Sequence, residues 1–129
     1  MGWVESTLQE FGQQIGVADL AFGSQGVAHL QGSDGGFIAI EAARRGPLDE
    51  VLVYLGTPLG FEAAAHVREA LDRVHFSNAG AWDLQIGTQG QGPETALIVL
   101  TRIAEREFTL QSLNAAIEYI RRWTETITS

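Results

Sequence analysis

Apolar residues recur at three- and four-residue spacing in three stretches of the chain, a pattern that predicts three amphipathic helices. The first helix is expected at residues 3–15, with Gly16 directly after its C-terminus, where glycine is favoured. The second is expected at residues 61–76, where Thr57 and Pro58 suit an N-cap and a first helical position. The third follows Thr109, a suitable N-cap residue.

Five stretches between these helices have the composition of β-strands. A glycine-rich turn separates the first two, which is typical of a β-hairpin. Residues 51–55 show no polar alternation, so they are expected to form a central strand that is buried on both faces. Residues 87–93 are rich in glycine and are expected to form an irregular loop. The strands are expected at residues 26–31, 37–42, 51–55, 81–86 and 95–103.

The order of these elements is helix, three strands, helix, two strands, helix. This order predicts an α+β fold with a twisted antiparallel sheet and helices packed on one of its faces. The length of 129 residues suits a single domain over residues 1–129, with a core large enough to need no covalent links.

Composition excludes several classes of function. The net charge of −8 argues against nucleic acid and anionic membrane surfaces as partners. The chain contains no cysteine, which excludes disulfides and thiolate chemistry, and its basic residues are all arginine, which excludes lysine chemistry. No apolar run approaches the ~20 residues that span a bilayer, so we expect no membrane insertion.

The sequence offers little that would support catalysis. The 87–92 loop lacks the Lys-Ser/Thr pair of a phosphate-binding loop, and no Gly-x-Ser-x-Gly motif occurs. Glu62, His66 and Glu69 share one face of the second helix and could offer three metal ligands. Glu69 and Arg73 also have the spacing of a helical ion pair, so a solvated helix face is the favoured interpretation. We therefore expect a protein that is not an enzyme and holds no cofactor.

Two stretches of the sequence resemble a known family. Residues 3–17, WVESTLQEFGQQIGV, and residues 97–123, LIVLTRIAEREFTLQSLNAAIEYIRRW, are similar to the first helix and to the last strand and helix of class I type III secretion chaperones. Within this Tir-chaperone (CesT) family, the two ends look most like the SycN type. The middle of the chain matches in pattern only.

The resemblance implies a cytoplasmic bacterial chaperone that binds the N-terminal segment of a secreted substrate and keeps it competent for secretion. SycN-like members serve a YopN-like gatekeeper and pair with a second small, YscB-like chaperone. Both a heterodimer of this kind and a homodimer remain open.

The resemblance also implies dimerisation through the middle helix and the strand after it. Three helices with apolar faces compete for one sheet, which independently suggests that one face forms a subunit interface, although this helix could instead pack on its own sheet. The expected interface residues are Ala63, Val67, Ala70, Leu71, Val74, Trp82 and Leu84.

Substrate binding is expected on the first helix, its connection and the outer strands, where an extended peptide could add to a free strand edge. Packing in the core explains the same residues equally well. The expected substrate-binding residues are Trp3, Leu20, Phe22, Val27, Leu30 and Phe37.

Two alternatives belong to other classes of function. One is a small non-catalytic α+β adaptor or ligand-binding domain with no role in secretion. The other is a metal-dependent enzyme that uses His66 and the neighbouring carboxylates.

Overall fold

The structure is a computed structural model of the chain, and it describes residues 2–17, 19–32, 35–45, 48–77 and 82–128. These residues form five strands and three α-helices in the expected order, so the α+β class is confirmed. The elements are α1 (Trp3–Ile15), β1 (Val27–Gln31), β2 (Phe37–Arg45), β3 (Leu48–Pro58), η1 (Gly60–Glu62), α2 (Ala63–Ser77), β4 (Gln85–Gln89), η2 (Gly92–Glu94), β5 (Ala96–Ala104), η3 (Glu105–Glu107) and α3 (Leu110–Thr128).

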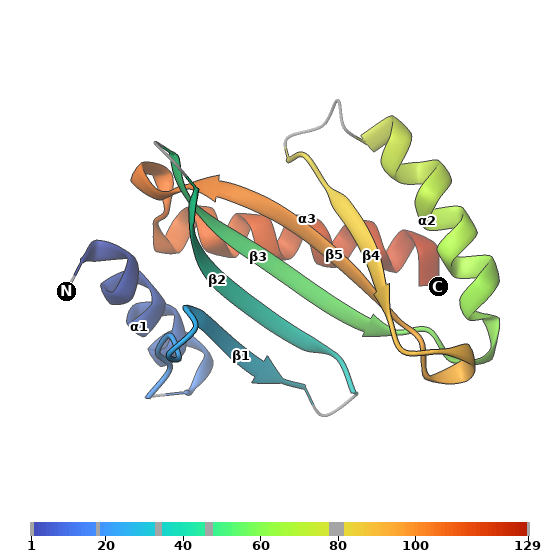
Figure 1. The fold of residues 1–129 in the computed structure, drawn as a ribbon, viewed down its shortest axis with the longest axis horizontal. Helices are drawn as coiled ribbons and strands as arrows, with labels where there is room; N and C mark the ends of the chain where they lie inside the picture. Colours follow the sequence, from blue (N-terminus) through green and yellow to red (C-terminus); the bar gives the residue numbers. More distant parts are fainter. Residues whose placement is uncertain (1, 18, 33–34, 46–47, 78–81, 129) are drawn as a thin grey trace.

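All strand pairs in the sheet are antiparallel, and the spatial order is β1-β2-β3-β5-β4. β3 is therefore the central strand, as its unbroken apolar sequence predicted, and it pairs along almost its whole length with both β2 and β5. β1 and β4 form the two edges (Figure 1).

One face of the sheet carries the main core. α3 lies across β3 and β5, while α1 and α2 contact α3 from opposite ends (Figure 1). Strand residues on this face alternate with those on the other, so Val51, Val53 and Val99 point under α3 and are fully buried. Fully buried residues of α3 meet them, namely Leu113, Ala116, Ile120 and Ile127.

The expected start of the second helix was wrong. Thr57 and Pro58 belong to the end of β3, where Pro58 is paired with Ala96 of β5. A proline is tolerated at this point because it lies at the very end of the strand. The next residue, Leu59, donates its N–H to the Thr95 carbonyl at 3.0 Å, and α2 begins only after η1.

The expected position of the fourth strand was also wrong. β4 covers Gln85–Gln89, so residues 87–89 of the expected loop are regular strand. Trp82 to Leu84 precede the strand, and Ala81 lies outside the described residues. Pairing with β5 causes this shift, because every residue of β4, including Gly87, is paired with a residue of β5. Tertiary pairing here outweighs the low β-propensity of glycine.

The N-terminus of α3 is capped as the sequence predicted. The Thr109 hydroxyl accepts a hydrogen bond from the Ser112 N–H at 3.0 Å, and the Ser112 hydroxyl accepts one from the Thr109 N–H at 2.9 Å. These reciprocal bonds satisfy two amides at the end of the helix that covers the core.

Replacing Thr109 by alanine removes one of these bonds. We expect Thr109→Ala to lower the free energy of unfolding by about 1 kcal/mol, measured by chemical denaturation. Gln111→Ala is the matched control, because Gln111 is exposed on the same helical turn, and its effect should stay within about 0.5 kcal/mol. Equal stability of the Thr109→Ala variant and the unmodified protein would contradict the capping role.

Candidate functional site

Among the residues that the structure describes, no strand pairs with the outer edge of β1. The bonds Ala42 N–H to Gly26 O (2.9 Å) and Gly32 N–H to Gly36 O (2.7 Å) set the alternation of the β1–β2 ladder. Even-numbered residues of β1 therefore bond to β2, and the backbone groups of His29 and Gln31 point away from the sheet. This edge can accept a further strand from an extended peptide.

An apolar groove lies next to this edge, at the end of the β1–β2 hairpin. We call it the hairpin groove; its volume is about 440 Å³. Its floor is a row of paired residues on the helix-bearing face of the sheet, Leu30, Ile38 and Leu55. Ile15 and Val17 form a wall at the C-terminus of α1, and both are exposed.

Arg121 of α3 is the charged member of the hairpin-groove lining. It forms an ion pair with Glu118, which also accepts a hydrogen bond from Arg122 at 2.9 Å. The hydrogen bonds from Arg121 and then Arg122 hold the pKa of the Glu118 carboxyl below its usual value. The groove is thus apolar, with a paired arginine at its rim.

A second groove lies between the N-terminal half of α1 and the segment that follows the helix, and we call it the α1 groove. Its volume is about 480 Å³, and Glu5 and Asp19 place two carboxylates on its rim. Leu8, Leu20, Ala21 and Phe22 supply its apolar lining. The two grooves around α1 therefore carry rim charges of opposite sign.

The expected substrate-binding residues are divided between these two grooves. Leu20 and Phe22 line the α1 groove, and Leu30 lies in the floor of the hairpin groove. Phe37 also borders the hairpin groove, but its ring packs over Gly56 on the opposite face of the sheet. Leu20 is buried, and the other three are half-buried. Sequence reasoning missed Ile15 as a binding residue, because it continues the apolar stripe of α1 at helical spacing, although it is 45% exposed.

Trp3 and Val27 line neither groove. Trp3 is half-exposed, and its indole N–H donates to the Phe108 carbonyl at 2.6 Å, which ties α1 to the segment before α3. Val27 is half-buried at the start of β1, and its carbonyl accepts the Gly23 N–H at 2.9 Å.

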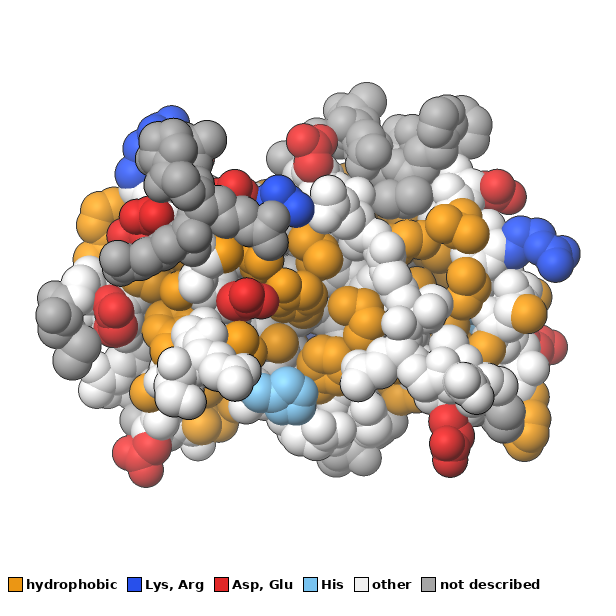
Figure 2. Space-filling view, in the orientation of Figure 1, with side chains coloured by type: hydrophobic (Ala, Val, Ile, Leu, Met, Phe, Trp, Pro, Cys, Tyr) orange, Lys and Arg blue, Asp and Glu red, His pale blue; other side chains and the backbone are white. Residues whose placement is uncertain are grey.

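The second face of the sheet carries no helix from this chain within the described residues (Figure 1). Apolar side chains gather over its centre, as Figure 2 shows in the same view. Leu52 is buried there, and the Tyr54 hydroxyl donates to the Glu41 carboxylate at 2.8 Å. The Phe37 ring lies over Gly56, where a Cβ would be only 2.1 Å from the ring, so the close approach requires glycine.

The expected dimer-interface residues occupy different environments. Ala63, Ala70 and Leu84 are buried within the chain, while Val67 and Trp82 are half-buried. Leu71 is 55% exposed. The side chain of Val74 lies outside the described residues.

Phe61, which was not among the expected interface residues, is 96% exposed. It belongs to η1, just before α2, and falls outside the apolar stripe that packs on the rest of the chain. A nearby groove, which we call the loop groove, separates α2 from the turn after β4 and has a volume of about 580 Å³. Its lining includes Ala64, Val67, Leu71, Thr88, Gly90 and Gly92.

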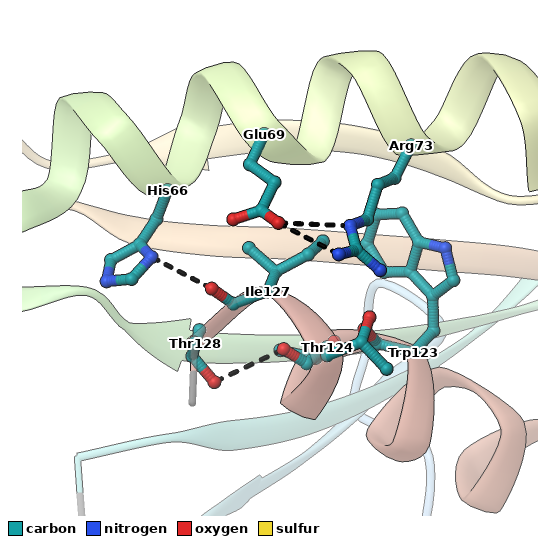
Figure 3. A network of polar contacts seen from close by, with 8 residues as sticks. His66, Glu69, Arg73, Trp123, Thr124, Ile127 and Thr128 are labelled. Carbon is teal, nitrogen blue, oxygen red and sulfur yellow. Dashed lines mark hydrogen bonds and ion pairs between the residues drawn. The ribbon is translucent and has the colours of Figure 1, made fainter.

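α2 is attached to the end of α3 by a histidine. His66 Nδ1 lies 3.0 Å from the carbonyl oxygen of Ile127, which belongs to the last turn of α3 (Figure 3). Carbonyls in the last turn of a helix lack partners within that helix, so an imidazole N–H supplies one here. One turn further along α2, Glu69 and Arg73 form an ion pair at 3.0 Å.

These contacts involve two of the three candidate metal ligands on the second helix, Glu62, His66 and Glu69. His66 and Glu69 each have another partner, and no group of three or more metal-ligating side chains comes together within the described part of the chain. Over the same residues, no helix combines the length and the apolar character that crossing a bilayer would require.

No family model and no curated protein matches the sequence. Solved structures do match the fold. A chain of the complex between the Yersinia pestis type III secretion chaperone SycH and a stable fragment of YscM2 has a TM-score of 0.68 at 9% identity, with 96% of this chain and 98% of that one covered.

Two further complexes match over similar lengths. A chain of the ExsC–ExsE complex has a TM-score of 0.64 at 14% identity, covering 98% of this chain and 94% of that one. A chain of the HopA1–SchA chaperone–effector complex has a TM-score of 0.63 at 12% identity, covering 95% and 91%. The chain therefore has the fold of type III secretion chaperones.

The His66 contact predicts a stability difference between two variants. His66→Leu removes the N–H donor and should lower the free energy of unfolding by about 1 kcal/mol. His66→Asn keeps an N–H donor near the position of Nδ1 and should retain most of that stability. Chemical denaturation measures both, and equal loss in the two variants would contradict a role for the hydrogen bond.

Proposed function

We propose that this chain is a type III secretion chaperone that binds a non-globular segment of a secreted protein. The observation that carries the proposal is the free edge of β1 with the apolar hairpin groove beside it, in a chain with the chaperone fold. Two of the matched structures are described as chaperones in complex with another protein or its fragment, which supports a partner of this kind.

The segment would bind as an added strand. His29 and Gln31 of β1 would exchange backbone hydrogen bonds with it, and its alternate side chains would fall on the side of α1. Those side chains would enter the hairpin groove, whose floor is aliphatic. This arrangement needs no chemistry from the chaperone, which fits a function without catalysis or cofactor.

The resemblance of residues 3–17 and 97–123 to the SycN type supports a finer assignment. The secreted partner would be a YopN-like gatekeeper, bound through its N-terminal segment in the bacterial cytoplasm. Dimerisation through α2 completes the proposal, with either a YscB-like chaperone or a second copy of this chain as the other subunit.

The hairpin groove provides the test. Ile15 is exposed at its wall, so Ile15→Asp places a charge in the groove while leaving the core intact. We expect this variant to lower affinity for the gatekeeper's N-terminal segment at least ~30-fold, measured by calorimetry after co-purification has identified the bound region.

Gln13→Asp is the matched control, because it adds the same charge to an exposed position on the same helix outside both grooves. It should bind the segment like the unmodified chain. Unchanged affinity of the Ile15→Asp variant would place the segment elsewhere, and failure of the unmodified chain to retain any gatekeeper segment would refute the chaperone function.

A further inference from the structure

We propose that the bound segment carries an aromatic residue, whose ring stacks on the imidazole of His29 on the face of the sheet away from α3. The inference rests on the proposed function and deepens it, because it names the class of segment that β1 selects. It follows from a row of packed rings that crosses the sheet and ends at the outer edge of β1.

The row begins at Gly56 in the central strand β3. Phe37 of β2 is paired with Gly56, and its ring packs so closely that a Cβ on Gly56 would lie 2.1 Å from it. The next ring is that of His29 in β1, whose centroid lies 5.0 Å from that of Phe37, with 24° between the two planes. This distance and this angle are typical of stacked rings. Phe37 is therefore fixed by the sheet and in turn supports His29.

His29 is the outermost member of this row. Its side chain is exposed, and Phe37 covers one face of its ring. β1 is an edge strand, so within the described part of the chain no strand lies beyond it to cover the other face (Figure 1). An added strand can extend the row, because side chains directly opposite each other on one face of a sheet lie ~4.5–5.5 Å apart.

The backbone of β1 determines where the segment meets His29. The Val27 carbonyl already accepts the Gly23 N–H at 2.9 Å, so the edge is covered at that point. The outward backbone groups of His29 and Gln31 are therefore the ones that an added strand can use. The segment residue that pairs with His29 turns its side chain to the face of His29, while the residues before and after it turn toward the hairpin groove.

The surroundings of His29 favour an aromatic residue over a charged one. Ala39, directly opposite His29 in β2, is buried. The Glu41 carboxylate, two residues further along β2, already accepts the Tyr54 hydroxyl at 2.8 Å. An arginine is also planar, but it would bring a positive charge to a histidine, which itself takes up protons near neutral pH. An aromatic ring adds no charge, favours the extended conformation of a strand and gains from stacking.

The two faces of the added strand therefore select different side chains. On one face, the aliphatic floor of the hairpin groove accepts aliphatic residues of the segment. On the other face, the imidazole of His29 accepts one aromatic residue between them. The class of segment that fits β1 is a short extended stretch in which an aromatic residue stands between two aliphatic ones.

A double-mutant cycle tests this inference, with the gatekeeper's N-terminal segment as the probe and calorimetry as the measurement. His29→Ala should weaken binding about 5-fold, because it removes one ring of the stack. Once the aromatic residue of the segment is replaced by alanine, His29→Ala should have no further effect, because the stack is already lost. His29→Phe keeps a ring at this position and should bind within about 2-fold of the unmodified chain.

Gln25→Ala is the matched control, because Gln25 is exposed two residues before β1 and lines neither groove. It should leave the affinity unchanged. His29 is exposed, so His29→Ala should keep the secondary structure seen by circular dichroism. The imidazole C–H resonances of His29 should move upfield when the segment binds, because they come to lie over an aromatic ring. A purely structural role of His29 would not produce that shift.

The outcomes separate this inference from the proposed function. A segment that protects the His29 and Gln31 amides from exchange, yet has no aromatic residue coupled to His29, would overturn the inference and leave the chaperone function standing. Coupling of His29 to an arginine or an aliphatic residue of the segment would overturn it as well. An unmodified chain that retains no gatekeeper segment would refute both.

Discussion

The pairing of β3 with β2 on one side and β5 on the other is the constraint on which the rest of the molecule depends. Both ladders run along nearly the whole length of β3, and α3 closes the face above them. β2, β3 and β5 each have a partner strand on both sides, so β1 and β4 are the edges of the sheet. Each candidate binding surface lies near one of those edges.

The two edges have different neighbours, and this difference separates the two proposed binding events. α1 stands beside β1 and borders two grooves, one with an acidic rim and one with a paired arginine at its rim (Figure 1). α2 and the glycine-rich turn stand beside β4. At ~4.8 Å between neighbouring strands, the edges are about 19 Å apart, so a segment on β1 leaves α2 free for a second subunit.

Elements with a strong local pattern were predictable from the sequence. α1 has its expected bounds, and Thr109 caps α3 as expected, because an apolar stripe and a capping residue identify a helix without tertiary information. β4 and Pro58 were misplaced because their conformation is decided by pairing with β5, which lies later in the chain. Such long-range pairing leaves little trace in the local sequence.

The candidate surfaces were harder to predict for a related reason. Apolar periodicity identifies the side of a helix that packs on its own chain, and so it selected Ala63 and Ala70, which are buried. Phe61 lies outside that stripe and is the most exposed of the large apolar side chains that the structure describes. An exposed apolar residue is recognisable only once the packing of the remaining side chains is known.

Backbone amide hydrogen exchange on β1 tests the central claim most directly. The chain is measured alone and with the N-terminal segment of the gatekeeper bound. If the segment adds to the sheet as a strand, exchange should slow at His29 and Gln31, whose N–H groups point away from β2, while amides already bonded within the sheet change little. A bound segment that leaves exchange at His29 and Gln31 unchanged would contradict the account.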